Sequence, residues 1–260
     1  MNLNSAVCIV TGSAVGVGAA CAVQLAKKGA RVVINYSKSE QEARATQAEC
    51  QAAGSETILV QGDVAQDADC KRIAQAALDK WGRIDGLINN AAITKFVDQR
   101  DLDGVDAEDF QHLYAVNVIG PYQMTRAASA ALQKQGGSVV MISSVSGING
   151  AGSSNAYVAS KGALNTMMLA LARALAPSVR VNAICPGLIE TRWHTARFSN
   201  PDDYKKFRDK YAENVPLGKA CSADDIAAVA IWLIEHGEMI TGEIIRVDGG
   251  QHLGSAWGKR

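Results

Sequence analysis

AVCIVTGSAVGVG, residues 6–18, is the stretch that decides the fold. It starts with an apolar run of strand length and continues directly into a glycine-rich turn, after which a helix is predicted over residues 16–28. Glycines at such a turn allow a sharp bend, and a helix N-terminus offers N–H groups to a phosphate. A tight strand–helix connection without a ligand is the alternative. The turn residues predicted to bind a nucleotide are Thr11, Gly12, Val15, Gly16, Val17 and Gly18.

The rest of the chain repeats this alternation of short Val/Ile/Leu-rich runs and longer amphipathic runs. Further strands are expected at residues 31–36, 57–61, 86–90, 138–143, 179–185 and 243–248. Further helices are expected at residues 40–53, 65–81, 106–133 and 155–176. Nearly continuous apolar strands are typical of a parallel sheet that is covered on both faces. The sequence therefore predicts an α/β fold: a single Rossmann-type domain over residues 1–260, with a doubly wound parallel sheet of about seven strands.

Composition excludes several classes of protein. Lys plus Arg equals 26 and Asp plus Glu equals 26, so the basic excess of a nucleic-acid-binding protein is missing. The sequence shows neither a signal peptide nor a run of about 18 apolar residues, so no membrane contact is expected. Six scattered cysteines without a Cys-x-x-Cys pair indicate reduced thiols, and the four histidines have no metal-ligand spacing. A cytoplasmic protein without a bound metal is expected.

The end of the second predicted strand bears on the choice of nucleotide. It reads Ile34-Asn35-Tyr36-Ser37-Lys38, and no carboxylate follows until Glu40. An NAD site normally has a carboxylate there for the ribose hydroxyls. An uncharged strand end followed by Lys38 would accept a 2′-phosphate, so NADP(H) is predicted as the preferred cofactor and NAD(H) as a possible one. Tyr36, Ser37 and Lys38 are assigned to this site, although Lys38 could also be an ordinary solvated lysine.

A group of polar residues is predicted to meet at one edge of the sheet. Tyr157 and Lys161 are four residues apart on one helix, so their side chains share a face. An ammonium group about 4 Å from a phenol would lower the phenol pKa and make the pair useful for proton transfer. A surface pair on a helix is the alternative. Ser144 and Asn90 follow strand ends that face the same edge, and Asn117 lies on the preceding helix.

Together these motifs make the sequence similar to the short-chain dehydrogenase/reductase family over about residues 5–250. The resemblance implies Ser144, Tyr157, Lys161 and Asn117 as catalytic residues, with Ser144 chosen over Ser143 because it precedes Tyr157 by thirteen residues. The resemblance also implies a further set of residues that contact the cofactor, from its adenine to its nicotinamide: Asp63, Val64, Asn90, Ala91, Pro186, Gly187 and Thr191. Two positions depart from the family pattern. Ala92 replaces a glycine, and Val15 stands where many NADP-preferring members have a basic residue.

The activity that the resemblance implies is hydride transfer between a nicotinamide cofactor and a small-molecule carbonyl or alcohol. The stretch 32–39 favours a 3-oxoacyl-acyl-carrier-protein-type or related ketone reductase, and a sugar, polyol or other secondary-alcohol dehydrogenase is the alternative. Arg173 could serve an acidic carrier protein, whereas Ala130 stands where another arginine would be expected. Two remoter alternatives are a non-catalytic nucleotide-binding regulator and a purely structural subunit.

Two further expectations concern a lid and the assembly. Residues 188–215 are predicted to form a substrate lid in which Trp193 and His194 either contact substrate or pack on the body of the protein. The helix at residues 155–176 is apolar around most of its circumference, which is typical of a helix buried on both sides. A homodimer or homotetramer is therefore expected, as is usual in the family.

Overall fold

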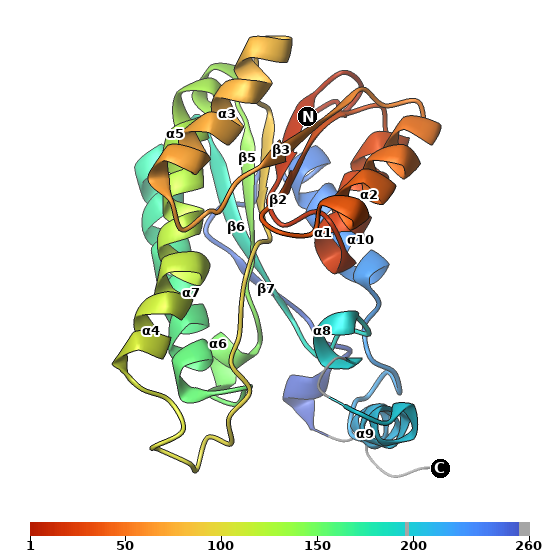
Figure 1. Cartoon of the computed structure of the whole chain (residues 1–260). Coiled ribbons are helices and arrows are strands. Elements are labelled where there is room, and N and C mark those ends of the chain that lie inside the picture. The colour runs from red at the N-terminus through yellow and green to blue at the C-terminus, as the bar shows by residue number, and fades with distance from the viewer. Residues whose placement is uncertain (196–197, 255–260) are drawn as a thin grey trace.

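The computed structural model describes residues 1–195 and 198–254, and within them one parallel sheet forms the centre of the molecule (Figure 1). Its strand order is β3-β2-β1-β4-β5-β6-β7, and every neighbouring pair is parallel. The strands are β1 (Val7–Val10), β2 (Arg31–Tyr36), β3 (Thr57–Gln61), β4 (Gly86–Asn89), β5 (Ser138–Ile142), β6 (Arg180–Pro186) and β7 (Ile244–Val247). The predicted doubly wound α/β fold is confirmed, with strand boundaries within one residue or so of those expected.

Helices cover both faces of this sheet (Figure 1). One face carries α1 (Gly16–Lys27), α2 (Glu40–Ala52) and α10 (Ala223–Glu235), and the other carries α3 (Asp67–Trp81), α5 (Gly120–Gln135) and α7 (Asn155–Leu175). Shorter or peripheral helices are α4 (Ala107–Tyr114), α6 (Ser146–Asn149), α8 (Arg192–Thr195) and α9 (Pro201–Glu213), together with the 3-10 turn η2 (Gln251–Leu253). Among the described residues, no helix has the length and apolar character needed to cross a membrane.

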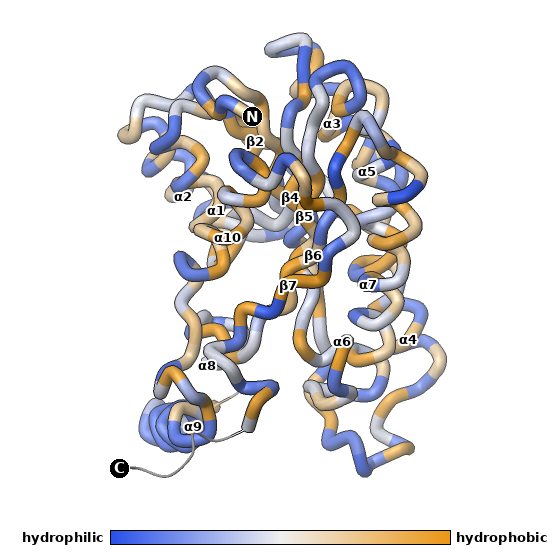
Figure 2. The backbone as a smooth tube through the Cα atoms, turned by 180° about the vertical axis from the view of Figure 1, so that it is seen from behind, coloured by the Kyte–Doolittle hydropathy of each residue, from blue (hydrophilic) through white to orange (hydrophobic). Residues whose placement is uncertain are grey.

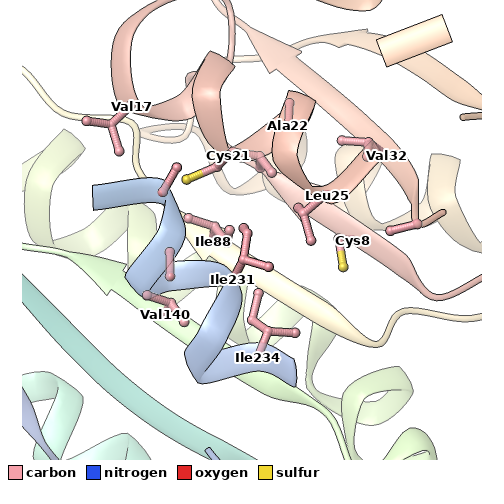
Figure 3. Close-up of a cluster of buried hydrophobic side chains, with 14 of the residues drawn as sticks. Cys8, Val17, Cys21, Ala22, Leu25, Val32, Ile88, Val140, Ile231 and Ile234 are labelled. Carbon is pink, nitrogen blue, oxygen red and sulfur yellow. The ribbon is translucent and has the colours of Figure 1, made fainter. Parts of the chain in front are cut away.

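The alternation of side chains along each strand divides the core into two layers. In β1, Cys8 and Val10 belong to the layer under α1 and α10, whereas Val7 and Ile9 belong to the layer under α3, α5 and α7. All four are completely buried, as a strand covered on both faces requires. Figure 3 shows the first layer, and Figure 2 shows the apolar strands running between more polar outer helices. The two layers make the strand ends a rigid frame for the loops that follow them.

The structure differs from the sequence prediction in three helical regions. The helix expected over residues 106–133 consists of α4, a π-helical segment η1 (Ala115–Ile119) and α5. The widened π turn contains Asn117, and such turns occur frequently at functional sites. Helix α10 had not been predicted, and the lid region contains α8 and α9.

Candidate active site

A cavity of about 1140 Å³ lies at the carboxyl ends of the strands. The position is where an open parallel sheet binds ligands, because the strand order reverses between β1 and β4. Most residues predicted for the site line this cavity: Gly12, Val15, Gly16, Val17, Ser37, Lys38, Asp63, Val64, Asn90, Ala91, Ser144, Tyr157, Lys161, Pro186, Gly187 and Thr191. Thr11, Gly18, Tyr36 and Asn117 are not among the lining residues. The topology therefore brings the two predicted groups, the nucleotide loop and the catalytic residues, into one cavity.

The glycine loop after β1 fits a pyrophosphate. Gly12 has φ +60°, and a Cβ atom there would lie 2.9 Å from Cα of Ala91. At Gly18 a Cβ atom would lie 2.4 Å from the carbonyl oxygen of Gly12, so the loop packs directly on the helix. No side chain caps the N-terminus of α1 and no acidic residue occupies its first turn. A negatively charged group can therefore approach the exposed N–H groups and the positive end of the helix dipole.

Asn35, at the end of β2, holds this loop in place. Its side-chain oxygen accepts a hydrogen bond from the N–H of Gly12 at 3.1 Å. Its amide group donates to the carbonyl oxygens of Val60 and Gly62 at 3.2 and 3.0 Å. Asn35 is 1% exposed, so these bonds join the glycine loop to β3 inside the protein. Sequence patterns alone assign no role to Asn35.

The residues predicted for the site that do not line the cavity support it from behind. The hydroxyl of Thr11 accepts hydrogen bonds from the N–H groups of Asn90 and Ala91 at 2.9 and 3.0 Å. The amide of Asn90 donates to the carbonyl oxygens of Thr11 and Gly12. These bonds tie the loop after β1 to the loop after β4. The side chain of Tyr36 is 9% exposed and packs in the core with α1 and α2, so Ser37 and Lys38, and not Tyr36, face the cavity from this strand end.

Tyr157 and Ser144 lie together on the opposite wall of the cavity. Tyr157 is in the first turn of α7, whose N-terminus is capped by the hydroxyl of Ser154, which accepts from the N–H of Tyr157 at 3.2 Å. Ser144 and Tyr157 both line the cavity, and the Ser144 hydroxyl acts to lower the pKa of Tyr157. Because Ser144 Oγ also accepts from the N–H of Ser146, its own hydrogen is free to be donated. The two hydroxyls can therefore bind the same substrate oxygen.

Lys161 lies beside Tyr157 but its ammonium group is hydrogen-bonded elsewhere. Its Nζ donates to the carbonyl oxygen of Ile142 at 2.9 Å and lies 5.7 Å from the centre of the Tyr157 ring. Burial lowers the pKa of Lys161 to about 8. Burial also raises the pKa of Tyr157 to about 12, although its hydrogen bond with Ser144 acts in the opposite direction. The expected lowering of the Tyr157 pKa by Lys161 is wrong for this arrangement, because loss of solvent has the larger effect.

Asn117 acts on the site through other residues. Its side-chain oxygen accepts from the N–H of Ile93, and its amide donates to the carbonyl oxygen of Ile93 and to the hydroxyl of Ser160. Ser160 in turn donates to the carbonyl oxygen of Tyr157 at 2.7 Å. Asn117 is 1% exposed. It thus joins the loop after β4 to the first turn of α7, on which Tyr157 lies.

Several residues of the segment 188–215, which was predicted to be a lid, line the cavity, and the segment is held by contacts that the sequence did not reveal. The hydroxyl of Tyr211, on α9, accepts from the N–H of Leu188 at 3.1 Å and donates to Oε1 of Gln251 at 2.9 Å. Trp193 lines the cavity with its ring centre 6.4 Å from that of Tyr157. The side chain of His194 and residues 196–197 lie outside the described part of the chain. Tyr211 and Gln251 could have been suspected only from the aromatic-rich lid and from the polar residue after Asp248-Gly249-Gly250.

Comparison with known proteins agrees with this geometry. The family described as enoyl-(acyl carrier protein) reductase matches residues 12–252. A protein of Streptomyces violaceoruber described as a granaticin polyketide synthase ketoacyl reductase is 37% identical over 95% of this chain and 96% of its own length. The L-rhamnose 1-dehydrogenase (NAD(P)(+)) of Sphingomonas sp. (strain SKA58) is 32% identical over 94% of this chain and 95% of its own length.

The same agreement holds for three-dimensional structure. A crystal structure from Burkholderia xenovorans, described as a short-chain dehydrogenase/reductase, superposes with a TM-score of 0.90 and 39% sequence identity. The superposition covers 96% of this chain and 99% of that one. Both the sequence relatives and the structural neighbour span nearly the whole chain, so the likeness includes the cavity and both of its walls. The chain belongs to the short-chain dehydrogenase/reductase family and is an oxidoreductase of the kind that uses a nicotinamide cofactor.

Proposed function

We propose that this protein reduces a ketone to a secondary alcohol, and catalyses the reverse reaction, with Tyr157 as the proton donor and acceptor. The observation that carries the proposal is that Tyr157 and Ser144 lie together at the wall of the cavity that also contains the glycine loop. When bound, the nicotinamide ring supplies or accepts the hydride. Gly12, Gly16 and Val17 would hold its pyrophosphate, and Pro186, Gly187 and Thr191 would lie at its nicotinamide end.

The protein residues handle the proton and the developing charge. Ser144 and Tyr157 both donate hydrogen bonds to the substrate oxygen, where negative charge appears during reduction. A phenol with a raised pKa is protonated at neutral pH, and it transfers its proton to the alkoxide as that charge develops. The ammonium group of Lys161, 5.7 Å from the centre of the ring, supplies positive charge beside the phenolate that remains. Asn117 keeps the first turn of α7 in position.

The walls around the substrate end favour a neutral substrate with an apolar body. Phe96, Leu188, Trp193 and Phe207 line this part of the cavity. Among the described lining residues the only Lys and Arg side chains are Lys38, Lys161 and Arg192, and only Lys161 lies beside Tyr157. A carboxylate substrate would therefore have no cation of its own. A 3-oxoacyl compound or a related ketone fits these walls.

The position of Arg173 in a single subunit does not favour recognition of an acyl carrier protein by this residue. Arg173 and Tyr157 are on the same helix, sixteen residues apart, which corresponds to about 24 Å along the helix axis. Arg173 therefore lies far from the cavity of its own subunit. We favour a small ketone or thioester over a carrier-bound substrate.

A neutral sugar or polyol is the second candidate, and a polar group of lining residues supports it. His112, Asn149, Ser153 and Gln251 also line the cavity. These side chains could bind several hydroxyl groups, and one relative is described as an L-rhamnose 1-dehydrogenase. Oxidation of such a substrate uses the same residues, with Tyr157 accepting the proton.

NADP(H) is the proposed cofactor and NAD(H) the alternative. The end of β2 presents Ser37 and Lys38 to the cavity without a carboxylate, and Lys38 forms no ion pair among the described residues. The ammonium group is therefore available to a phosphate. Val15, which lines the same part of the cavity, provides no second cation in the glycine loop.

A panel of ketoacyl thioesters, small ketones, steroids and sugars, each measured with NADPH and NADH or their oxidised forms, tests the function directly. We expect turnover of at least one uncharged ketone and a higher kcat/KM with the phosphorylated cofactor. Nucleotide binding without turnover of any compound in the panel would favour a regulator. The absence of nucleotide binding would favour a structural subunit.

Association into a homodimer or homotetramer through the helices on one face of the sheet is also proposed. Leu169 on α7, Tyr122 on α5 and Ile119 just before α5 are 44%, 43% and 48% exposed. Helices α5 and α7 lie next to each other on the same side of the molecule (Figure 1). A second copy would bury these side chains in a symmetric contact. Light scattering at micromolar concentration that gives the mass of a monomer would contradict this assembly.

A further inference from the structure

Arg192 reaches across the mouth of the cavity from the lid to the nucleotide edge. It is the first residue of α8 and lines the cavity. Its guanidinium group donates to Oε1 of Glu42, on α2, at 2.8 Å, and to the hydroxyl of Ser39 at 3.5 Å. Ser39 follows Lys38 directly in the sequence. Arg192 from the lid thus contacts the segment Ser37–Ser39, whose middle residue is the cation Lys38.

The charged groups around this segment are balanced in number, and most of them are paired with each other. Lys38 has no ion-pair partner in the described ranges, and Arg192 is paired with Glu42. Glu40, the other carboxylate at the start of α2, is paired with Arg44 at 2.6 Å. Asp63 also lines the cavity, and its carboxylate accepts a hydrogen bond from the N–H of Ala65 in the loop after β3. Within this group Lys38 and Asp63 form no ion pair among the described residues, and Arg192 is held beside Ser39 by a partner it can exchange.

The pair of Arg192 and Glu42 is suited to such an exchange. The side chains of Arg192 and Glu42 are 53% and 41% exposed, so water screens the attraction between them. The hydrogen bond from Arg192 holds the pKa of Glu42 below its usual range, and Glu42 is therefore an anion at neutral pH. A phosphate ester carries up to two negative charges and accepts two parallel hydrogen bonds from a guanidinium group. A phosphate near Ser37–Ser39 would compete with Glu42 for Arg192.

We infer that Arg192 is the second cation for the 2′-phosphate of the nucleotide, so that the lid itself takes part in selecting NADP(H) over NAD(H). The inference rests on the proposed function, because it assigns a residue to the cofactor site proposed there. It also supplies the cation that is missing at Val15. In the absence of the 2′-phosphate, Arg192 pairs with Glu42, and when the 2′-phosphate is present Arg192 turns toward it.

A binding experiment with fragments of the cofactor separates this role from that of a simple lid contact. Adenosine 2′,5′-bisphosphate and adenosine 5′-monophosphate, which lacks the 2′-phosphate, are titrated calorimetrically into the full-length protein and into Arg192→Gln and Glu42→Gln. Arg192→Gln should weaken binding of the bisphosphate about tenfold and that of the monophosphate by about twofold at most. Glu42→Gln should strengthen binding of the bisphosphate about threefold, because it removes the competing carboxylate.

The two substitutions break the same ion pair, so a purely structural contact predicts the same change from both. Equal changes for the two variants, or equal changes for the two ligands, would overturn the inference. Equal affinity of the wild-type protein for the two ligands would also overturn the inference. Arg208→Gln is the matched control, since it removes a lid arginine that pairs with Asp209 and Glu190, and it should leave the ratio of the two affinities unchanged.

The same variants distinguish failure of this inference from failure of the proposed function. Binding of the two fragments requires no carbonyl substrate and no turnover. If the panel of carbonyl compounds gives no turnover while the affinities change in opposite directions, the inference stands and the proposed reaction does not. If turnover is found and the affinities change in the same direction, the reaction stands and the role of Arg192 does not.

Discussion

The two walls of the cavity are built in different ways. The wall at the ends of β1, β2 and β4 is held by buried hydrogen bonds, with Thr11, Ser13 and Asn35 at most 1% exposed. The lid has no buried residue in α9, a helix that is mostly hydrophilic in Figure 2. Its charged contacts, such as that of Arg208 with Asp209, are partly exposed to solvent. The difference indicates that the wall expected to hold the dinucleotide is fixed before binding, whereas the residues proposed to discriminate between ligands lie on a segment held by solvent-exposed contacts.

Gly18→Ala should have the largest effect on the fixed wall. The new methyl group would lie within 2.4–2.9 Å of the backbone of Gly12 and Ser13 and of the Asn90 amide. Because these atoms belong to the loop itself, the loop must shift, and nucleotide binding should weaken by at least about thirtyfold. Gly162→Ala in α7 is the control, because its Cβ atom would meet its nearest neighbour at an ordinary 3.6 Å. Equal nucleotide affinity in the two variants, measured calorimetrically, would show that the wall is not rigid.

Asn35→Ala should be the next most damaging change. It leaves the N–H of Gly12 and the carbonyl oxygens of Val60 and Gly62 without their partner inside the protein. We expect the free energy of unfolding to fall by about 2 kcal/mol, as for other buried hydrogen-bond networks that lose one member. Urea denaturation followed by circular dichroism measures it. If Asn35→Ala lowers the free energy of unfolding no more than an exposed lid substitution such as Lys206→Ala does, the two walls do not differ as described.

The buried ammonium group of Lys161 should make the stability of the nucleotide-free protein depend on pH. Its pKa is about 8 in the folded protein and 10.5 in its reference state, so the unfolded chain binds more protons between these values. The cost of burying the charge is complete below pH 8 and is relieved as the pH rises toward 10, so the Tm should increase over this range. Lys161→Met should not show this increase. A wild-type Tm that falls in parallel with that of the variant would contradict the direction of the shift.

Tyr211→Phe should have the smallest effect on overall stability, and it acts on the lid. It removes the hydroxyl that links Leu188 to Gln251, at a cost of about 1 kcal/mol that is confined to the lid. We expect faster hydrogen exchange in α9 with little change in Tm. Tyr204→Phe is the control on the same helix, because the Tyr204 hydroxyl is buried without a hydrogen-bond partner among the described residues. Equal exchange rates in the two variants would mean that Tyr211 does not hold the lid.

Local sequence patterns were sufficient for the fold and for much of the site. The glycine turn, the strand ends and the spacing of Tyr157 and Lys161 depend on residues close in sequence, and the sheet then brings them to one edge. Asn35 could not be assigned, because its partners in β3 are fixed only by the pairing of β2 with β3. Arg192 was missed for the same reason, since its partner is 150 residues away.

Helix α10 is a different case, because its signal was present in the sequence. Ser222 and Asp225 form a capping box at its N-terminus, and an apolar run follows them, so this helix could have been predicted.

The pKa of Tyr157, in contrast, could not be predicted from the sequence. It depends on how much solvent the surrounding side chains remove, and the spacing of Tyr157 and Lys161 on the helix does not determine that.

Tyr157→Phe tests the central claim most directly. Turnover of the best ketone should fall by at least about a hundredfold, while the affinity for the nucleotide should change by about twofold at most, because the phenol hydroxyl serves the substrate oxygen. Tyr114→Phe removes a nearby hydroxyl that donates to the carbonyl oxygen of Ala159 on α7, and it should retain turnover. Turnover within about tenfold of wild type in Tyr157→Phe would contradict the assignment of Tyr157 as the proton donor.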